Sequence, residues 1–275
     1  MKPVRFDYVV ARDSAEAVQL LRQHGDEAKC IAGGQSLGPM LNLRLARPTV
    51  LIDLHRAEDL GLTEQKSDHI VYGSTQRHVD FEDGLVPDAT NGMLQAVASR
   101  LAYRAIRNRG TVGGSIAHAD PAADWIGVMV GLDATYQLRG TKGLRDVPST
   151  DFMSAAFMTM LGSEEILVGV SLPRLSKAAR WGYYRYCRKS SGFSEATGIV
   201  VADPERGYCR VVLGALDIPP VALEQVANAL AEKGVDEAIA CTGEAVNEML
   251  AGYSDAKRQL FTVVVRRALA QIGEQ

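Results

Sequence analysis

Apolar residues in the first part of the chain alternate between a helical spacing and short continuous runs. Residues 13–25 (DSAEAVQLLRQHG) bring their apolar side chains to one helical face and predict a helix. We expect Asp13 to cap the start of this helix and Gly25 to end it. Short apolar runs at 28–34 and 48–54 predict strands, and the first of them ends in two adjacent glycines.

The middle of the chain has a second block of strands around a long helical pattern. A strand is predicted at 69–74 (HIVYGS), and the apolar spacing within 83–110 predicts a long helix that ends near Gly110. Residues 131–140 and 165–173 predict two more strands, on either side of a polar connection that is rich in turn formers.

The last part of the chain begins with strands and ends with helices. A strand is predicted at 180–188, and a hairpin at 197–216 has its turn at 203–207. Three stretches with helical spacing follow, at 221–234, 236–250 and 255–273.

The change from mixed strands and helices to a helix-rich end indicates a domain boundary near 174–180. Strands mixed with helices, followed by a helix-rich end, are typical of an α+β protein. We therefore expect two domains, 1–175 and 176–275, the first of them divided into subdomains of about 1–56 and 57–175.

Composition places the chain among ordinary soluble globular proteins. Of its 275 residues, 47% are hydrophobic and 23% are charged, which is the balance of a protein with a sizeable core. The 30 basic and 33 acidic residues leave a net charge of −3, which argues against a general affinity for nucleic acid. No apolar run is long enough to span a membrane, and the first residues contain no signal-peptide stretch. We therefore expect a cytoplasmic protein.

The cysteines and histidines predict no metal site in this chain. The four cysteines, at 30, 187, 209 and 241, include no CxxC pair, so we expect free thiols. His118, Asp120 and Asp124 could form a metal cluster, but Asp120 and Pro121 more simply open a helix. The end of the long predicted helix carries four arginines, Arg100, Arg104, Arg107 and Arg109. Their positive charge could stabilise the C-terminus of that helix, or they could form a docking surface for a partner subunit.

Two glycine-rich segments interrupt the core-building pattern. The first, CIAGGQSLGPMLNLRLARP, covers 30–48, and the second, RNRGTVGGSIAHADPAADW, covers 107–125. Adjacent glycines permit positive φ and a close approach to the backbone, so each loop could present a run of N–H groups to a phosphate. Hydroxyl groups that could add hydrogen bonds belong to Ser36, Thr111 and Ser115.

Neither segment has the spacing of the common nucleotide-binding loops. The GxGxxG pattern of Rossmann folds and the GK[ST] ending of P-loops are both missing from them. A single glycine pair is most simply a tight turn. Two pairs with matching hydroxyl residues suit a pyrophosphate held between two loops. The residues alone leave both interpretations open, two turns or a dinucleotide site.

The segments AGGQSLGPMLNLRLARP and IRNRGTVGGSIAHADPAAD together closely resemble the paired signatures of the FAD-binding medium subunit of molybdenum hydroxylases, the family of xanthine dehydrogenase and aerobic carbon monoxide dehydrogenase. The resemblance extends over essentially the whole chain, including residues 183–189 and the stretch VVLGALDIPPVALEQVANAL. It implies a two-part FAD-binding domain of the PCMH type, followed by a smaller α+β C-terminal domain with a helical tail.

The resemblance also implies roles for particular residues. The first loop would wrap the pyrophosphate and the neighbouring ribose or ribityl oxygens through Ala32, Gly33, Gly34, Gln35, Ser36 and Leu37. The opposing loop would consist of Thr111, Gly113, Gly114 and Ser115, with Ser115 in place of the family's usual asparagine. Asp124 matches a position that hydrogen-bonds the ribityl chain or the ring edge. Lys189 matches a basic position near the flavin, and Phe193 a position near the isoalloxazine.

The function that the resemblance implies is electron transfer through non-covalent FAD, since neither motif places a His or Cys at the family's contact positions. A small subunit would carry [2Fe–2S] clusters, and a large subunit would carry the molybdenum cofactor and oxidise the substrate. This chain would have no catalytic residue of its own. Family analogy implies a dimer of such heterotrimers. A stand-alone FAD-dependent oxidoreductase and a non-enzymatic assembly factor with a degenerate flavin site are the alternatives.

Overall fold

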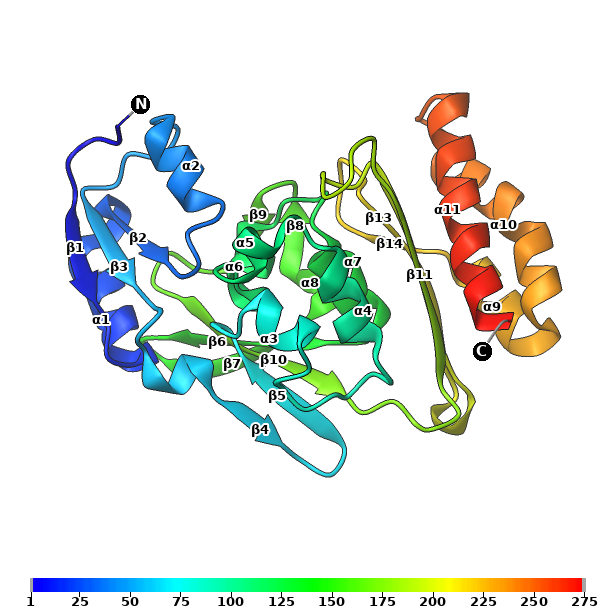
Figure 1. Ribbon diagram of the computed structural model, residues 1–275, viewed down its shortest axis with the longest axis horizontal. Helices are drawn as coiled ribbons and strands as arrows, with labels where there is room; N and C mark the ends of the chain where they lie inside the picture. Colours follow the sequence, from blue (N-terminus) through cyan, green and yellow to red (C-terminus); the bar gives the residue numbers. More distant parts are fainter. Residues whose placement is uncertain (1, 274–275) are drawn as a thin grey trace.

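The computed structural model describes residues 2–273, and its three larger sheets follow one another along the long axis of the molecule (Figure 1). The first sheet is parallel, with strand order β1-β3-β2. Its elements are β1 (Asp7–Val10), α1 (Ser14–His24), the 3-10 turn η1 (Gly25–Glu27), β2 (Ala28–Ile31), α2 (Leu37–Asn42) and β3 (Val50–Asp53). The two strands predicted in this region are confirmed.

Local signals determine α1, as the sequence predicts. The side chain of Asp13 accepts a hydrogen bond from the backbone N–H of Glu16 at 2.8 Å, which satisfies one of the free donors at the helix start. Gly25 follows the last turn with a φ of 53°, a conformation that glycine adopts without strain. Ala17 and Leu21 face inward and are buried. Both capping predictions are confirmed.

The second sheet is antiparallel and has the strand order β4-β5-β10-β6-β7. Its strands are β4 (Thr63–Gln65), β5 (His69–Gly73), β6 (Thr135–Gly140), β7 (Gly143–Pro148) and β10 (Ile166–Pro173). Around it lie η2 (Glu58–Gly61), α3 (His78–Glu82), α4 (Met93–Arg100), α5 (Arg104–Arg107), α6 (Val112–His118), α7 (Asp124–Gly131), α8 (Ser149–Phe152) and the small hairpin β8 (Met153–Ala155) and β9 (Met158–Thr159). The three strands predicted for the middle of the chain are confirmed.

The long helix predicted to end near Gly110 is wrong, because two short helices, α4 and α5, occupy that stretch. Ala102 lies between them with a φ of 39°, a left-handed conformation that cannot continue a helix. The guanidinium of Arg107 donates to the carbonyl oxygens of Leu101 and Ala102 at 2.8 and 3.0 Å. These contacts hold the break, so the four arginines do not share one helix end.

The helix expected to open at Asp120 and Pro121 is also misplaced. α7 begins at Asp124, after an extended Ala123. The side chain of Asp120 instead accepts a hydrogen bond from the N–H of Ala122 at 2.9 Å, so Asp120 closes a turn that precedes the helix.

The third sheet is antiparallel, with order β11-β12-β13-β14. Its strands are β11 (Arg180–Tyr186), β12 (Ala196–Asp203), β13 (Tyr208–Gly214) and β14 (Val221–Ala222), with η3 (Pro204–Arg206) at the hairpin turn; α9 (Glu224–Lys233), α10 (Val235–Met249) and α11 (Asp255–Gly273) follow. The strand, the hairpin, its turn and the three helices of the prediction are confirmed.

The third sheet lies between α7 and α11 (Figure 1). Neighbouring residues of a strand point to opposite faces, and β12 shows this directly. Ile199 contacts Gly127 and Gly131 of α7, whereas a methyl group on Gly198 would lie 2.7 Å from the carbonyl oxygen of Val264 in α11. Glycine at 198 therefore lets the last helix pack its backbone against the sheet.

One hydrophobic core continues from the second sheet into the third. It includes Trp125 and Tyr136 together with Tyr183 and Ile199. A further core lies between the third sheet and α9–α11, and another lies under α1. Because apolar packing crosses the proposed boundary near 174–180, the division into domains stays a prediction. Within residues 2–273, no helix is long and apolar enough to cross a membrane.

Candidate functional site

The two glycine-rich loops meet in space. A methyl group on Gly33 would lie 2.7 Å from the Cα atom of Gly110 and 2.8 Å from the carbonyl carbon of Arg109. No side chain fits in that distance, so only glycine at 33 allows the loop after β2 to rest on the segment that leads into α6. The convergence inferred from the sequence is thus present in the fold.

The first loop offers free backbone donors. In the described chain, the N–H groups of residues 33–37 donate no hydrogen bond to another protein group. Gly34 has a φ of 69°. The side-chain amide of Gln35 donates from Nε2 to the carbonyl oxygen of Gly33 at 2.8 Å, which holds the loop in shape. Successive unpaired N–H groups around a glycine with positive φ form a concavity suited to an anion. The hydroxyl of Ser36 is exposed at its rim.

Ala32 and Leu37 flank this loop and have a different role. Ala32 packs on the core under α1, and Leu37 packs with Leu41 and Leu51 beneath α2. They fix the two ends of the loop by apolar contact.

The second loop does not present free N–H groups, so that part of the prediction is wrong. The N–H of Gly113 donates to the carbonyl oxygen of Ser74 at 2.9 Å, and that of Gly114 donates to the Thr111 hydroxyl at 3.1 Å. The N–H of Ser115 donates to the Thr111 carbonyl at 3.0 Å. Thr111 is the N-cap of α6 and is buried. Its loop is therefore a rigid wall opposite the first loop.

Close packing explains the glycine at 113. A methyl group there would lie 2.6 Å from the carbonyl oxygen of Ser74, so the loop can pair with the segment after β5 only with glycine at this position. Gly114 is exposed and Ser115 is half-buried, and within residues 2–273 the Ser115 hydroxyl has no hydrogen-bond partner. Ser115 is the polar side chain that this wall leaves available to a ligand.

Asp124 is buried in a network that the sequence did not reveal. Its carboxylate accepts hydrogen bonds from the hydroxyls of Tyr183 and Ser194, and it forms an ion pair with Arg185 at 3.1 Å. Burial raises the pKa of the Asp124 carboxyl, and the Arg185 charge opposes this rise. Both oxygens are occupied inside the protein, so a flavin contact through this carboxylate stays a prediction.

Arg185 ties this network to the loop after β11. Besides Asp124, its guanidinium donates to the carbonyl oxygens of Arg100, at 2.7 Å, and of Gly192. Burial disfavours its charge, but the neighbouring Asp124 raises the pKa of Arg185 above its ordinary value. Sequence reasoning missed this residue, because nothing in the strand pattern distinguishes a buried arginine from an exposed one.

A basic cavity of about 590 Å³ lies between this loop and the break that precedes α5. The cationic side chains at its wall are Arg100, Arg104, Arg107, Arg185 and Lys189. Three of these charges are neutralised, since Arg104 pairs with Asp83 at 2.6 Å, Arg107 with Glu82 at 2.7 Å and Arg185 with Asp124 at 3.1 Å. Lys189 is exposed and forms no ion pair within the described residues. Phe193, on the same loop, is 71% exposed.

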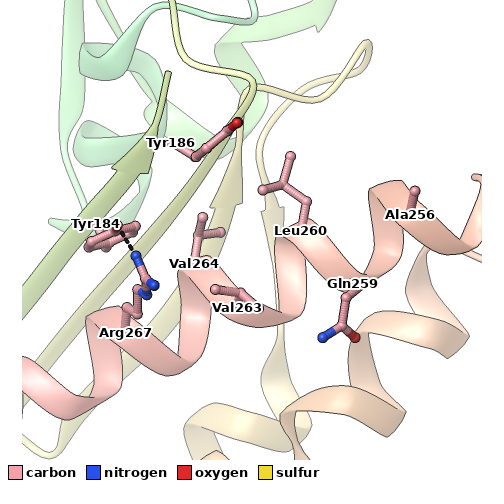
Figure 2. Close-up of a pocket in the computed structure, with 8 residues that line it drawn as sticks. All are labelled: Tyr184, Tyr186, Ala256, Gln259, Leu260, Val263, Val264 and Arg267. Carbon is pink, nitrogen blue, oxygen red and sulfur yellow. Dashed lines mark hydrogen bonds between the residues drawn. The ribbon is translucent and has the colours of Figure 1, made fainter. Parts of the chain in front are cut away.

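A second, apolar groove of about 340 Å³ lies between β11 and α11, and Figure 2 shows its lining. Tyr184, Tyr186, Leu260 and Val263 line it, and Arg267 donates a hydrogen bond to the Tyr184 hydroxyl. This groove is on the α11 side of the third sheet, away from both glycine loops, and none of the predicted site residues lines it.

Comparisons with known proteins agree with this geometry. Residues 4–175 match the model of the FAD binding domain in molybdopterin dehydrogenase. The chain is 30% identical over 279 residues to the carbon monoxide dehydrogenase medium chain of Hydrogenophaga pseudoflava, covering 98% of this chain and 97% of that one. It is 36% identical over 211 residues to the 6-hydroxypseudooxynicotine dehydrogenase complex subunit alpha of Paenarthrobacter nicotinovorans, covering 76% and 71%.

A solved structure shows the same likeness over the full chain. The carbon monoxide dehydrogenase from Hydrogenophaga pseudoflava contains a chain that matches this one with a TM-score of 0.93 and 31% identity, over 100% of this chain and 99% of that one. The α+β fold and the family inferred from the two glycine segments are therefore confirmed. The chain belongs to the family of FAD-binding domains of molybdopterin dehydrogenases and is an FAD-binding medium subunit of the molybdenum hydroxylase type.

Proposed function

We propose that this chain transfers electrons, through bound FAD, from the [2Fe–2S] clusters of a small subunit to an external acceptor. A large subunit with the molybdenum cofactor would oxidise the substrate. The family assignment and the names of relatives, which are medium chains or subunits of dehydrogenase complexes, support this division. The assembly as a dimer of heterotrimers and the cytoplasmic location stay predictions from the sequence.

The observation that carries the proposal is the junction of the two glycine loops. The unpaired N–H groups of residues 33–37 would bind the pyrophosphate oxygens, with the Ser36 hydroxyl beside them. The Thr111–Ser115 loop would form the opposite wall and add the Ser115 hydroxyl. Gly33 and Gly113 would act through packing, because each brings a second segment closer than any side chain permits.

The flavin end would extend toward the basic cavity. Lys189 and Phe193 lie on the loop that borders it, and Arg185 holds the carbonyl oxygen of Gly192 in that loop. When bound, FAD supplies the redox chemistry, while the protein sets its orientation and electrostatic surroundings. An uncompensated lysine at this loop would stabilise negative charge on the reduced ring. The buried Asp124 would position Arg185, and no residue of the site needs to act as an acid or base.

A spectrum of the purified chain, alone and with its neighbouring subunits, tests the proposal. We expect flavin absorption bands and release of FAD on denaturation. Gly33→Ala should reduce FAD binding, because its methyl group would displace the first loop from Gly110. Gly252→Ala is the matched control, since a methyl group there meets no atom within 4 Å. A wild-type complex that takes up no added FAD would refute the proposal.

Kinetic behaviour separates the proposal from a stand-alone oxidoreductase. The medium subunit should show no substrate-driven reduction of its flavin until the small and large subunits are added. Reduction of the flavin in the isolated chain by an organic substrate, at the rate of the complex, would favour the stand-alone enzyme. A correctly folded protein that binds no flavin would favour an assembly role.

A further inference from the structure

His78 is a buried histidine next to both glycine loops. It is the first residue of α3 and is 8% exposed. Its backbone N–H donates to the carbonyl oxygen of Gly110 at 2.9 Å, and the N–H of Val112 donates to the backbone carbonyl oxygen of Gln76 at the same distance. These antiparallel contacts fix the position of His78 relative to the second loop.

The protein determines which ring nitrogen of His78 carries the proton. The indole Nε1–H of Trp125 donates to Nδ1 of His78 at 3.1 Å. An indole nitrogen is a donor only, so Nδ1 must be an unprotonated acceptor. Burial and the nearby charge of Arg107 lower the pKa of His78 to about 4, which keeps the ring neutral. In the neutral ring the hydrogen is therefore on Nε2.

The Nε2 edge of the ring points to the junction of the loops. The position that a Cβ atom on Gly110 would take is 2.8 Å from both Nε2 and Cδ2 of His78, and the Cα of Gly110 is 2.7 Å from the corresponding position on Gly33. Gly110 thus lies in space between the imidazole edge of His78 and Gly33. The ring fits only because residue 110 has no side chain.

This Nε2–H has no acceptor of its own. Within residues 2–273 no atom accepts a hydrogen bond from it, and Nε2 is accessible to solvent. Because Nε2 is open to solvent at this edge, water or a ligand that enters the junction can accept its hydrogen bond. The free N–H groups of the first loop favour an acceptor that bears negative charge.

We propose that His78 is a positioning residue that holds its neutral ring so that Nε2–H donates to a phosphate oxygen of the bound dinucleotide. This inference rests on the proposed function, since it assumes that FAD lies between the glycine loops. It adds a donor from outside both signature segments, one whose tautomer is set by Trp125.

Two substitutions separate the two ring nitrogens. In His78→Asn the side-chain oxygen can replace Nδ1 as the acceptor for Trp125, but the donor at Nε2 is lost. In His78→Gln the longer amide can place an N–H near the Nε2 position. FAD affinity of the full chain with its partner subunits should fall about tenfold to a hundredfold in H78N, as for a lost hydrogen bond to a charged group, and should largely return in H78Q.

His69→Asn is the control, because His69 lies in β5 and pairs with Asp68. Nitrogen NMR of selectively labelled wild-type protein gives a second readout that needs no variant. We expect an Nε2–H tautomer whose resonance shifts when FAD, or ADP as a pyrophosphate probe, is added. Equal FAD affinity in folded H78N and wild type, or an Nε2 resonance unaffected by both ligands, would overturn the inference and leave the proposed function intact. Failure of the wild-type complex to bind FAD would overturn both.

Discussion

The buried pair of Asp124 and Arg185 gives a quantitative test of how the loop after β11 is held. The two side chains are only 6% and 8% exposed, so the pair belongs to the buried class and not to the weak surface class. Arg185→Met would remove the partner of the carboxylate and three further hydrogen bonds, to Cys187, Arg100 and Gly192. An unpaired buried charge makes such a change costly.

We expect Arg185→Met to lower the free energy of unfolding by about 3–5 kcal/mol, as for a buried pair broken on one side. For a chain of this size that is a decrease in melting temperature on the order of 10 °C. Thermal unfolding of R185M, Asp124→Asn and the double variant forms a double-mutant cycle, in which the double variant should lose clearly less than the sum of the singles. Arg12→Met is the control, because Arg12 pairs with Glu16 on the surface, with 82% of its side chain exposed.

A coupling energy below about 0.5 kcal/mol, which is the limit of simple additivity, would refute this reasoning. Equal melting temperatures for R185M and R12M would also refute it. FAD affinity should fall in R185M as well, because the loop with Lys189 and Phe193 loses its attachment at Gly192.

Three further results are expected. Gly113→Ala should destabilise the chain with or without FAD, measured by thermal unfolding, because its methyl group meets the Ser74 carbonyl; a change seen only in FAD affinity would contradict a packing role. The pKa of His78 is lowered from 6.5 to about 4 by burial first and Arg107 second, so its contribution to stability is complete above pH 6.5. That contribution should fall by about 3 kcal/mol as the pH drops to 4, because the unfolded state binds the proton first. The free energy of unfolding of H78Q should lack this dependence on pH, and equal pH profiles of wild type and H78Q would contradict the lowered pKa of His78. Lys189→Ala should leave unfolding unchanged but lower the flavin reduction potential, measured by redox titration, and an unchanged potential would place Lys189 away from the ring.

Local rules account for much of what the sequence predicted. Asp13 and Gly25 mark the ends of α1 through contacts within a few residues, and the turn before Tyr208 likewise depends on its own residues, with Gly207 at a φ of 60°. The glycine segments were recognisable because a close backbone approach requires that residue type in any fold.

The misses depend on side-chain and loop contacts that the hydrophobic pattern does not record. The break at Ala102 is held by the Arg107 guanidinium, against a helical pattern that continues through it. In the second loop, the N–H of Gly113 pairs with the distant Ser74, whereas those of Gly114 and Ser115 pair with Thr111 of the loop itself. Asp124 meets Arg185 because the third sheet packs on α7. The spacing of apolar residues predicts none of these pairings.

The junction at Gly33 and Gly110 also couples two separately packed parts of the chain. The first loop rests on the core under α1, whereas the second is attached to the core that contains Trp125. A dinucleotide bound across the junction would act as a crosslink, and by mass action it would add about 2.7 kcal/mol to stability at a free concentration a hundred times its Kd. The region around α1 and β1–β3 should then be the part whose hydrogen exchange depends most on FAD, so that loss of the cofactor would loosen the amino-terminal sheet before the rest of the subunit.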